Sequence, residues 1–260
     1  SIQKGTIEQA HKKITDSINY AKSIQEALLT SRSFISSCIN DYFLLFKPKE
    51  TVSGDFYYVN KINNQLVLAV ADCTGHGVPG GLITMLAITY LHESVRHKES
   101  IDSGSVLELL RKRFKKTFKK FGSQNNNGLD IALCSIDLDT NIMQYAGANN
   151  PIIIIRDNEL KLHEPVKNPI GFYPKEKPFV TNTIQLYKND VIYLFSDGYQ
   201  DQFGGNENRK YLKNRFLDTL QKIHNLPMEV QHAKLETYLS EWQNVNQQTD
   251  DITVLALKWK

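Results

Sequence analysis

The sequence predicts an α+β fold in which two layers of mostly antiparallel sheet are covered on their outer faces by pairs of helices. Short apolar segments separated by turn residues follow one another along the chain as hairpins, and amphipathic helical segments come two at a time. Helices and strands do not alternate one by one, so a parallel βαβ sheet is not indicated. The chain has 260 residues, 41% of them hydrophobic and 23% charged, which is ordinary for a globular protein that buries a sizeable core.

Residues 6–32 predict one helix ahead of the sheets. Ile7, Ile14, Ala21 and Leu28 recur every seven residues, with polar residues on the other faces. This seam suits either a helix packed on its own domain or a short parallel coiled coil, and the pattern does not choose between them. We expect residues 1–33 to be a linker helix from an upstream sensor, with a homodimer through this helix as one outcome, and residues 34–260 to form the domain.

The remaining elements follow in order along the chain. Turn residues separate three predicted strands, at residues 41–47, 55–61 and 65–72. A long apolar helix to residue 98, an amphipathic helix at 105–122 and a polar loop to 128 come next. The rest of the chain predicts two hairpins at residues 130–147 and 151–165, an irregular segment at 164–183 and a strand–turn–strand unit at 182–198. Two helices at 207–223 and 229–243 and a closing strand at 250–259 complete the prediction.

Four aspartates stand at the ends of predicted strands, beside glycine or another turn residue. They are Asp55, Asp72, Asp197 and Asp250. A lone Asp-Gly is most simply a turn, so the prediction depends on the whole set. A partly buried aspartate costs stability unless something pairs with it, and four such strand ends meeting in one domain would concentrate negative charge. Divalent cations would compensate that charge, and oxygen ligands suit magnesium and manganese.

Composition argues against several other classes of protein. The net charge of +3 is small and no nucleic-acid motif accompanies it, so we expect no nucleic-acid partner. The three cysteines form no CxxC pair, which favours a reduced compartment over a disulfide framework. No apolar run approaches the roughly 18 residues that span a bilayer. We therefore expect a cytoplasmic domain, including the case of a cytoplasmic end of a membrane-bound sensor. The basic run at residues 111–120 predicts a solvated face or a docking surface for an acidic partner.

Five stretches, from residue 41 to about 258, carry a resemblance to a known family. They read VSGDFYYV, LAVADCTGHGVPGGLITML, YAGANNPI, NDVIYLFSDGYQD and TDDITVLALK. With them the chain resembles the PPM (type-2C-like) protein serine/threonine phosphatases, in particular the SpoIIE/RsbU branch of bacterial regulatory phosphatases. The resemblance implies an α/β/β/α sandwich of two mostly antiparallel sheets flanked by paired helices, preceded by a linker helix.

The resemblance also implies roles for single residues. Asp55 and Asp72 match the central metal ligands and catalytic residues, with Asp72 bridging two Mn²⁺ or Mg²⁺ ions, and Cys73 matches a backbone carbonyl ligand. The remaining carboxylate ligands match Asp197 and Asp250. A bridging water activated by the two metals would attack a phosphoserine or phosphothreonine. The positions that would shape or support the site are Gly54, Gly75, Gly77, Asp201, Asp251 and, more weakly, Asn149.

Several expectations stay open. His76 is either a general acid or a structural residue of its Gly-His-Gly turn, and Asp201 is either part of the site or a solvated carboxylate. Asn149 is weakened as a candidate because Ala148 stands where many relatives have histidine. The chain also lacks an arginine beside the first strand, which predicts weak activity without a partner.

For the partner, the resemblance implies a phosphorylated STAS-type anti-sigma-factor antagonist. Sensor input through the linker helix and the helix at residues 78–98 would change the geometry of Asp72 and Cys73. One alternative is a degenerate domain that only binds its partner, although all four aspartates are present. Another is a different metallohydrolase, such as a nuclease.

Overall fold

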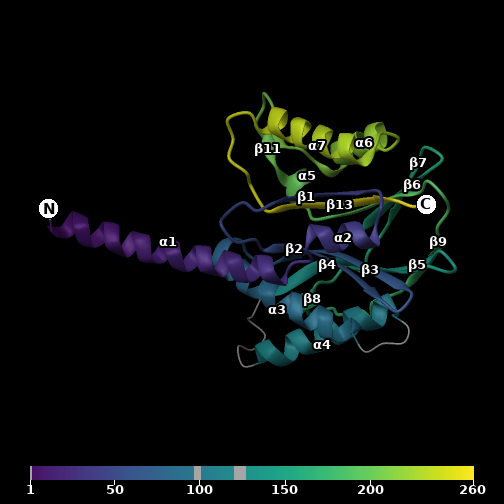
Figure 1. Cartoon of the computed structure of the whole chain (residues 1–260), viewed down its shortest axis with the longest axis horizontal. Coiled ribbons are helices and arrows are strands. Elements are labelled where there is room, and N and C mark those ends of the chain that lie inside the picture. The colour runs from purple at the N-terminus through teal and green to yellow at the C-terminus, as the bar shows by residue number, and fades with distance from the viewer. Residues whose placement is uncertain (1, 97–100, 120–126) are drawn as a thin grey trace.

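Two antiparallel sheets lie face to face with helices on both outer sides, as the computed structural model of residues 2–96, 101–119 and 127–260 shows (Figure 1). One sheet has the order β2 (Asp55–Ile62), β3 (Gln65–Cys73), β4 (Gly128–Asp137), β5 (Ile142–Ala148) and β9 (Asn182–Gln185), with β8 (Ile170–Gly171) beside β4. The other has the order β1 (Tyr42–Lys47), β13 (Ile252–Lys258), β10 (Val191–Phe195), β6 (Ile152–Arg156) and β7 (Glu159–His163). The predicted α+β sandwich is confirmed.

The core forms three apolar layers, one between the sheets and one under each helix pair. Strand β3 shows how the sequence builds two of them. Val67 and Ala69 face the helices, whereas Leu66 and Leu68 face the other sheet, and all four are buried. Side chains alternate between the two faces of a strand, so a strand buried on both faces reads as one continuous apolar run.

The first sheet is covered by α3 (Gly77–Val95) and α4 (Ser103–Phe118), and the second by α6 (Lys213–Ile223) and α7 (Met228–Gln243) (Figure 1). The Asp102 side chain caps α4 by accepting a hydrogen bond from the Ser105 backbone N–H. The predicted ends of these first two helices, and most of the polar loop at 122–128, fall on residues 97–100 and 120–126, outside the described residues.

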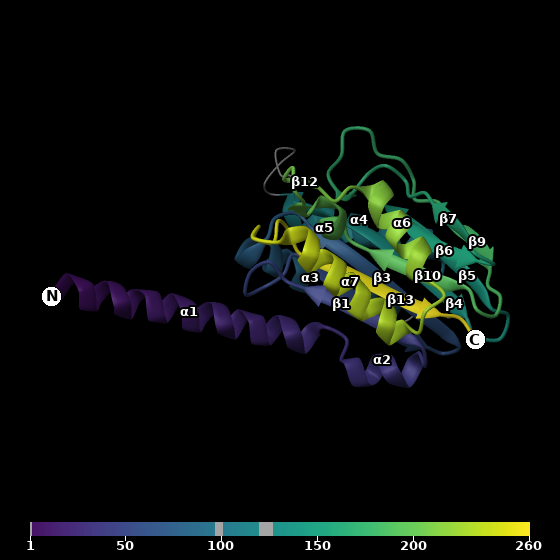
Figure 2. The same cartoon turned by 90° about the horizontal axis from the view of Figure 1, so that it is seen from above.

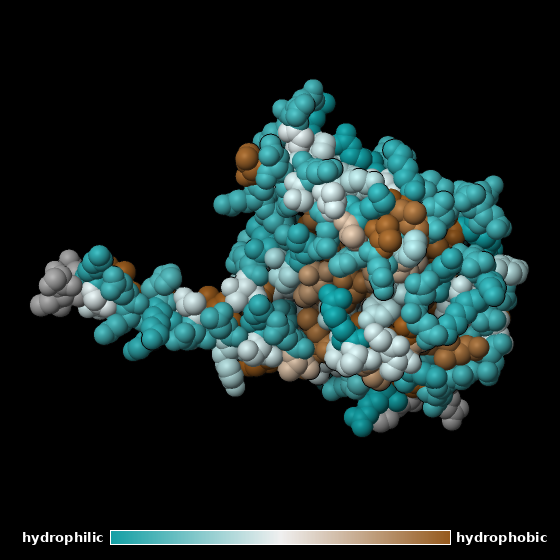
Figure 3. Space-filling view, turned by 45° about the horizontal axis from the view of Figure 1, so that its top comes forward, coloured by the Kyte–Doolittle hydropathy of each residue, from teal (hydrophilic) through white to brown (hydrophobic). Residues whose placement is uncertain are grey.

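The N-terminal helix α1 (Ile2–Leu28) projects away from the sandwich (Figures 1 and 2). Its apolar residues stand singly among hydrophilic ones (Figure 3), and Ile7 and Ile14 are 68% and 61% exposed. The predicted extension to residue 32 is wrong. The helix ends at Leu28, and a second helix, α2 (Arg32–Cys38), follows after a short turn. The Ser31 hydroxyl caps the first turn of α2.

The predicted helix at residues 207–223 begins only at Lys213. A short helix, α5 (Gly198–Asp201), and a small hairpin of β11 (Phe203–Gly204) and β12 (Arg209–Lys210) precede it. The turn of this hairpin holds Gly205 and Asn208 at positive φ, and a helix does not form through such residues.

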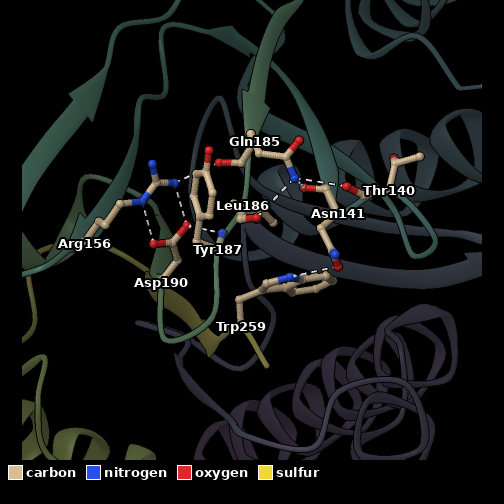
Figure 4. Close-up of polar contacts among 8 residues, drawn as sticks. All are labelled: Thr140, Asn141, Arg156, Gln185, Leu186, Tyr187, Asp190 and Trp259. Atoms are coloured by element: carbon tan, nitrogen blue, oxygen red, sulfur yellow. Dashed lines mark hydrogen bonds and ion pairs between the residues drawn. The ribbon is translucent and has the colours of Figure 1, made fainter.

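A polar clamp joins the two sheets at the end where β10 begins (Figure 4). Arg156 makes a two-pronged ion pair with the buried Asp190, which also accepts from the Tyr187 backbone N–H. The Gln185 amide donates to the Thr140 and Asn141 carbonyls, and Trp259 Nε1 donates to Asn141 Oδ1. Asp197 follows the far end of β10, so the length of the strand puts the clamp roughly 20 Å from that residue.

In the described ranges, none of the helices combines the length and the apolar character needed to cross a bilayer.

Candidate metal centre

Three aspartates lie side by side across three neighbouring strands. Asp55 opens β2 and pairs in register with Asp72 near the end of β3, and Asp72 pairs in register with Asp130 in β4. Directly opposed residues of antiparallel strands point to the same face with Cβ atoms about 5 Å apart. The register alone therefore brings these three carboxylates together where the strands begin or end.

The second sheet holds the innermost of these carboxylates. Ser196 Oγ and Thr253 Oγ1 donate to Asp55 Oδ2 over 2.5 and 2.7 Å. These donors come from the end of β10 and from β13, so the Asp55 side chain, which is 1% exposed, reaches across the gap between the sheets. Both hydroxyls engage the same oxygen, which fixes the orientation of the carboxylate.

The same end of the sheets carries the other two predicted ligands. Asp197 follows β10 and Asp250 precedes β13, and these strands are antiparallel neighbours, so the two residues lie at the same end. Burial raises the pKa of Asp72 well above its usual value, and the charges of Asp55, Asp197, Asp250 and Asp130 raise that pKa further. The structure thus brings the four predicted aspartates together and adds a fifth.

The cluster gathers negative charge at positions that are only partly open to water, with Asp55 fully buried. Burial raises the pKa of Asp55 well above normal despite its two hydroxyl donors, and burial with the charges of Asp201 and Asp250 raises the pKa of Asp197 to about 6. Several buried carboxylates with raised pKa values destabilise one another when ionised. A divalent cation bound among them would offset that cost, and all the side-chain donors are hard oxygens.

Backbone carbonyls pack tightly beside these carboxylates. A Cβ atom added to Gly54 would lie 2.5 Å from the Gly75 carbonyl oxygen and 3.2 Å from that of Cys73, and Gly75 itself has φ +88°. Cys73 N–H donates to the Gly54 carbonyl over 3.1 Å. Only glycine allows the two loops to approach this closely, so carbonyl oxygens are available where the carboxylates meet.

Side chains alone do not complete a site. In the part of the chain that the structure describes, no three His, Cys, Asp or Glu side chains are close enough to hold a metal ion together. Carbonyl oxygens and water would have to supply further ligands, as is usual for magnesium. Burial raises the pKa of the Cys73 thiol well above normal, which keeps it protonated and unsuited to soft metals. The residues therefore fit hard divalent ions.

A family model described as Stage II sporulation protein E (SpoIIE) matches residues 63–260, about three quarters of the chain. The chain belongs to the SpoIIE family. This confirms the resemblance noted in the sequence, and places the chain in a PP2C-type phosphatase family whose members are generally enzymes.

Solved structures agree with the family assignment. The SiaA-PP2C domain of Pseudomonas aeruginosa is 29% identical, with a TM-score of 0.88 over 96% of this chain and 99% of that one. The RsbU and RsbW domains of Rv1364c from Mycobacterium tuberculosis are 21% identical, with a TM-score of 0.67 over 84% of this chain and 59% of that one. RsbX in complex with magnesium is 17% identical, with a TM-score of 0.57 over 84% of this chain and 94% of that one. The last two show the shared fold alone. Comparison with curated protein sequences gives no significant match.

His76 and Asp201 lie at the margin of the cluster in this SpoIIE-family domain. His76 is half exposed, and its Nδ1 lies 2.6 Å from Glu50 Oε1. The Gly-His-Gly turn itself depends on its glycines, which adopt φ +88° at Gly75 and φ +65° at Gly77. Asp201 accepts a hydrogen bond from Lys210 Nζ over 2.7 Å and contributes to the raised pKa of Asp197.

Asp251 and Asn149 support the cluster without standing at its centre. Asp251 accepts hydrogen bonds from the backbone N–H groups of Lys49 and Gly54, each over 2.7 Å, and so fixes the segment between β1 and β2. Asn149 Nδ2 donates to Asp130 Oδ1 over 2.9 Å. Sequence reasoning missed Asp130, although it too stands at the start of an apolar strand.

Proposed function

We propose that this SpoIIE-family domain is a metal-dependent protein serine/threonine phosphatase. The observation that carries the proposal is the cluster of Asp55, Asp72, Asp197 and Asp250, whose strands bring these carboxylates to the same end of both sheets. Asp55 is buried, and the other three are partly buried. In the proposal, these four carboxylates, with the Cys73 carbonyl, would hold two Mn²⁺ or Mg²⁺ ions, and Asp72 would be shared between them. The magnesium in the complex of RsbX supports this choice of ion.

When bound, two such ions would activate a water molecule and offset the charge on the phosphoryl oxygens. The protein's own part is to hold the ligands ready. Ser196 and Thr253 fix the Asp55 carboxylate, and Asp251 fixes the loop that precedes it. Because the free carboxylates have raised pKa values, metal binding releases protons and strengthens as the pH rises. The surface contact of His76 with Glu50 favours a structural role for this histidine over that of general acid.

The substrate in this proposal is a phosphorylated regulatory protein of the STAS type, in bacterial signalling. The RsbU-like neighbour that carries an RsbW domain supports a place in such partner-switch systems. We place the domain in the cytoplasm, downstream of a sensor connected through residues 1–33, with residues 34–260 as the phosphatase unit.

Contacts from α1 and α3 support a regulatory role for the linker helix. Gln25 of α1 is buried, and its amide donates to the Ser53 carbonyl over 2.6 Å and accepts from the Ser53 N–H over 2.9 Å. Thr84 of α3 donates to the Gly54 carbonyl over 2.6 Å. Both helices therefore hold the two residues that precede Asp55. Movement of α1, driven by a sensor or by pairing of its exposed seam with a second copy, would shift this metal ligand.

Phosphate release from a phosphoserine- or phosphothreonine-bearing protein, measured with and without Mn²⁺, tests the proposal. The wild-type domain should release phosphate only with metal, and Asp72→Asn should abolish the reaction while circular dichroism shows an intact fold. Asp139→Asn, at an exposed turn, is the matched control. Full activity of Asp72→Asn would contradict the metal assignment. Phosphoprotein binding without any metal-dependent release by the wild type would instead support the alternative of a binding module.

A further inference from the structure

A groove beside the acidic cluster has no part in the chemistry proposed above. It lies between the β11–β12 hairpin, α6 and Trp242 of α7, with a volume of about 650 Å³. Four of its charged lining residues are cations and two are acids, namely Arg209, Lys210, Arg215, Lys222, Glu207 and Asp218. A basic groove next to an acidic cluster would attract acidic ligands that the cluster itself repels.

The groove adjoins the cluster at Lys210. The ammonium group of Lys210 donates to Asp201, and the Asp201 N–H in turn donates to the Asp197 carbonyl over 3.0 Å. The root of the hairpin is bonded to the other side of the cluster, because Phe203 N–H donates to the hydroxyl of Thr249, the residue before Asp250. A peptide segment bound along the groove would therefore lead to the carboxylates.

The groove is preformed. Trp242 Nε1 donates to the Gln202 carbonyl over 2.9 Å, and the Trp242 carbonyl accepts from the Gly205 N–H over 2.8 Å. The Arg215 guanidinium stacks 4.1 Å from the centre of the Trp242 ring. An arginine held by stacking keeps its N–H donors for a ligand and loses little entropy on binding.

Arg215 and Lys222 are the cations of the groove that remain open to a ligand. Across the described ranges, no carboxylate lies within ion-pair distance of either side chain. They stand seven residues apart on α6, or about 10 Å along the helix. On α4, whose basic run predicts either a solvated face or a docking surface, three of the cations are instead paired within the chain. Those pairs join Arg111, Arg113 and Lys115 to Glu108, Glu93 and Glu176.

One residue of the groove is in a strained conformation. Leu212 has φ +74° and ψ 147°, yet its side chain is 59% exposed at the groove edge. A bulky residue in this glycine region costs on the order of 1–3 kcal/mol. Such strain persists only where the surrounding structure fixes the backbone, and it is common at ligand-binding sites. Leu212 adds an apolar contact next to the cations.

We propose that this groove docks an acidic segment of the phosphoprotein substrate and so leads its phosphorylated residue to the carboxylate cluster. The inference rests on the proposed phosphatase function and deepens it. The carboxylates themselves repel an acidic phosphoprotein, whereas Arg215 and Lys222 attract it beside them. Complementary charge of this kind raises the association rate and fixes the register of the partner.

Steady-state kinetics on two substrates test the docking groove. The variant Arg215→Glu with Lys222→Glu should raise KM for an acidic phosphoprotein by roughly tenfold or more, because like charges then face each other. Its kcat, and its kcat/KM for p-nitrophenyl phosphate, should stay unchanged. Lys222→Glu alone, at an exposed position without stacking contacts, should give a smaller rise in KM and guards against misfolding of the double variant.

The matched control is Lys112→Glu with Lys116→Glu, which reverses two exposed charges on α4 and should leave KM unchanged. An unchanged KM in the groove variants, or an equal loss on both substrates, would overturn the docking role. Fluorescence anisotropy of the labelled phosphoprotein on Asp72→Asn measures docking without turnover. If reversing the Arg215 and Lys222 charges weakens phosphoprotein binding, the docking role is supported even if the wild type hydrolyses nothing. If the binding affinity does not depend on these charges, the docking role is refuted.

Discussion

Replacing Asp197 by asparagine should stabilise the metal-free domain at pH 7. The pKa of Asp197 is raised from 3.8 to about 6, so the folded state binds the proton more tightly than the unfolded chain does. Two pKa units correspond to about 3 kcal/mol, which is the full cost of ionised Asp197 above pH 6. The cost falls to roughly half at pH 5 and vanishes below pH 3.8. Its side chain caps no helix N–H, so the asparagine loses no capping bond.

Thermal unfolding of wild type and Asp197→Asn in EDTA, at pH 7 and pH 5, measures this effect. About 3 kcal/mol corresponds to a rise in Tm of roughly 5–10 °C for a domain of this size, and the gap should narrow at pH 5. The quantity to compare is the difference in Tm between the two proteins at each pH. Burial lowers the pKa of His163 to about 4, so protonation of this histidine destabilises both proteins equally as the pH falls.

Manganese should reverse the order at pH 7, since the wild type gains more stability from binding the ion than the variant does. Asp139→Asn serves as the control, since it removes an exposed charge far from the cluster. A wild type at least as stable as Asp197→Asn in EDTA at pH 7 would refute the idea of uncompensated carboxylates.

Three further predictions concern α1, the groove and the polar clamp between the sheets. Gln25→Ala removes two buried hydrogen bonds to the backbone of Ser53 and should cost about 1–3 kcal/mol in denaturant unfolding. It should also weaken manganese binding in a titration. Unchanged manganese affinity would show that α1 does not influence the metal site. Leu212→Gly relieves backbone strain and should keep or raise Tm while KM for the phosphoprotein rises; a lower Tm would argue against strain. Arg156→Ala removes the ion-pair partner of the buried Asp190, which keeps only the Tyr187 N–H. Because the Arg156 side chain is 38% exposed, the change should cost about 1–3 kcal/mol of unfolding free energy, with manganese affinity retained.

The layered fold and most of the acidic cluster could be predicted because they depend on local patterns. Continuous apolar runs such as β3 mark strands buried on both faces, and an aspartate at the start or end of such a run has to lie near the end of a strand. The residues next to Asp55 and Asp72 therefore predict their positions, and the apolar stripes of the paired helices predict which faces pack on the sheets.

What could not be predicted depends on contacts between distant parts of the chain. Asp130 joins the cluster only through the register of β3 and β4, which no local pattern shows. Gln25 looked like one of many polar residues on a solvated helix, and only the packing of α1 against α3 buries it. The β11–β12 hairpin replaced a predicted helix start because Gly205 and Asn208 adopt positive φ inside a polar stretch that also suits a helix.

Anomalous diffraction from crystals of the wild-type domain grown with Mn²⁺ tests the central claim most directly. We expect two manganese peaks about 3.5–4 Å apart, with Asp72 between them and Asp55, Asp197 and Asp250 as further ligands. Fully occupied manganese elsewhere on the domain, or no peak among these four carboxylates at millimolar Mn²⁺, would contradict it.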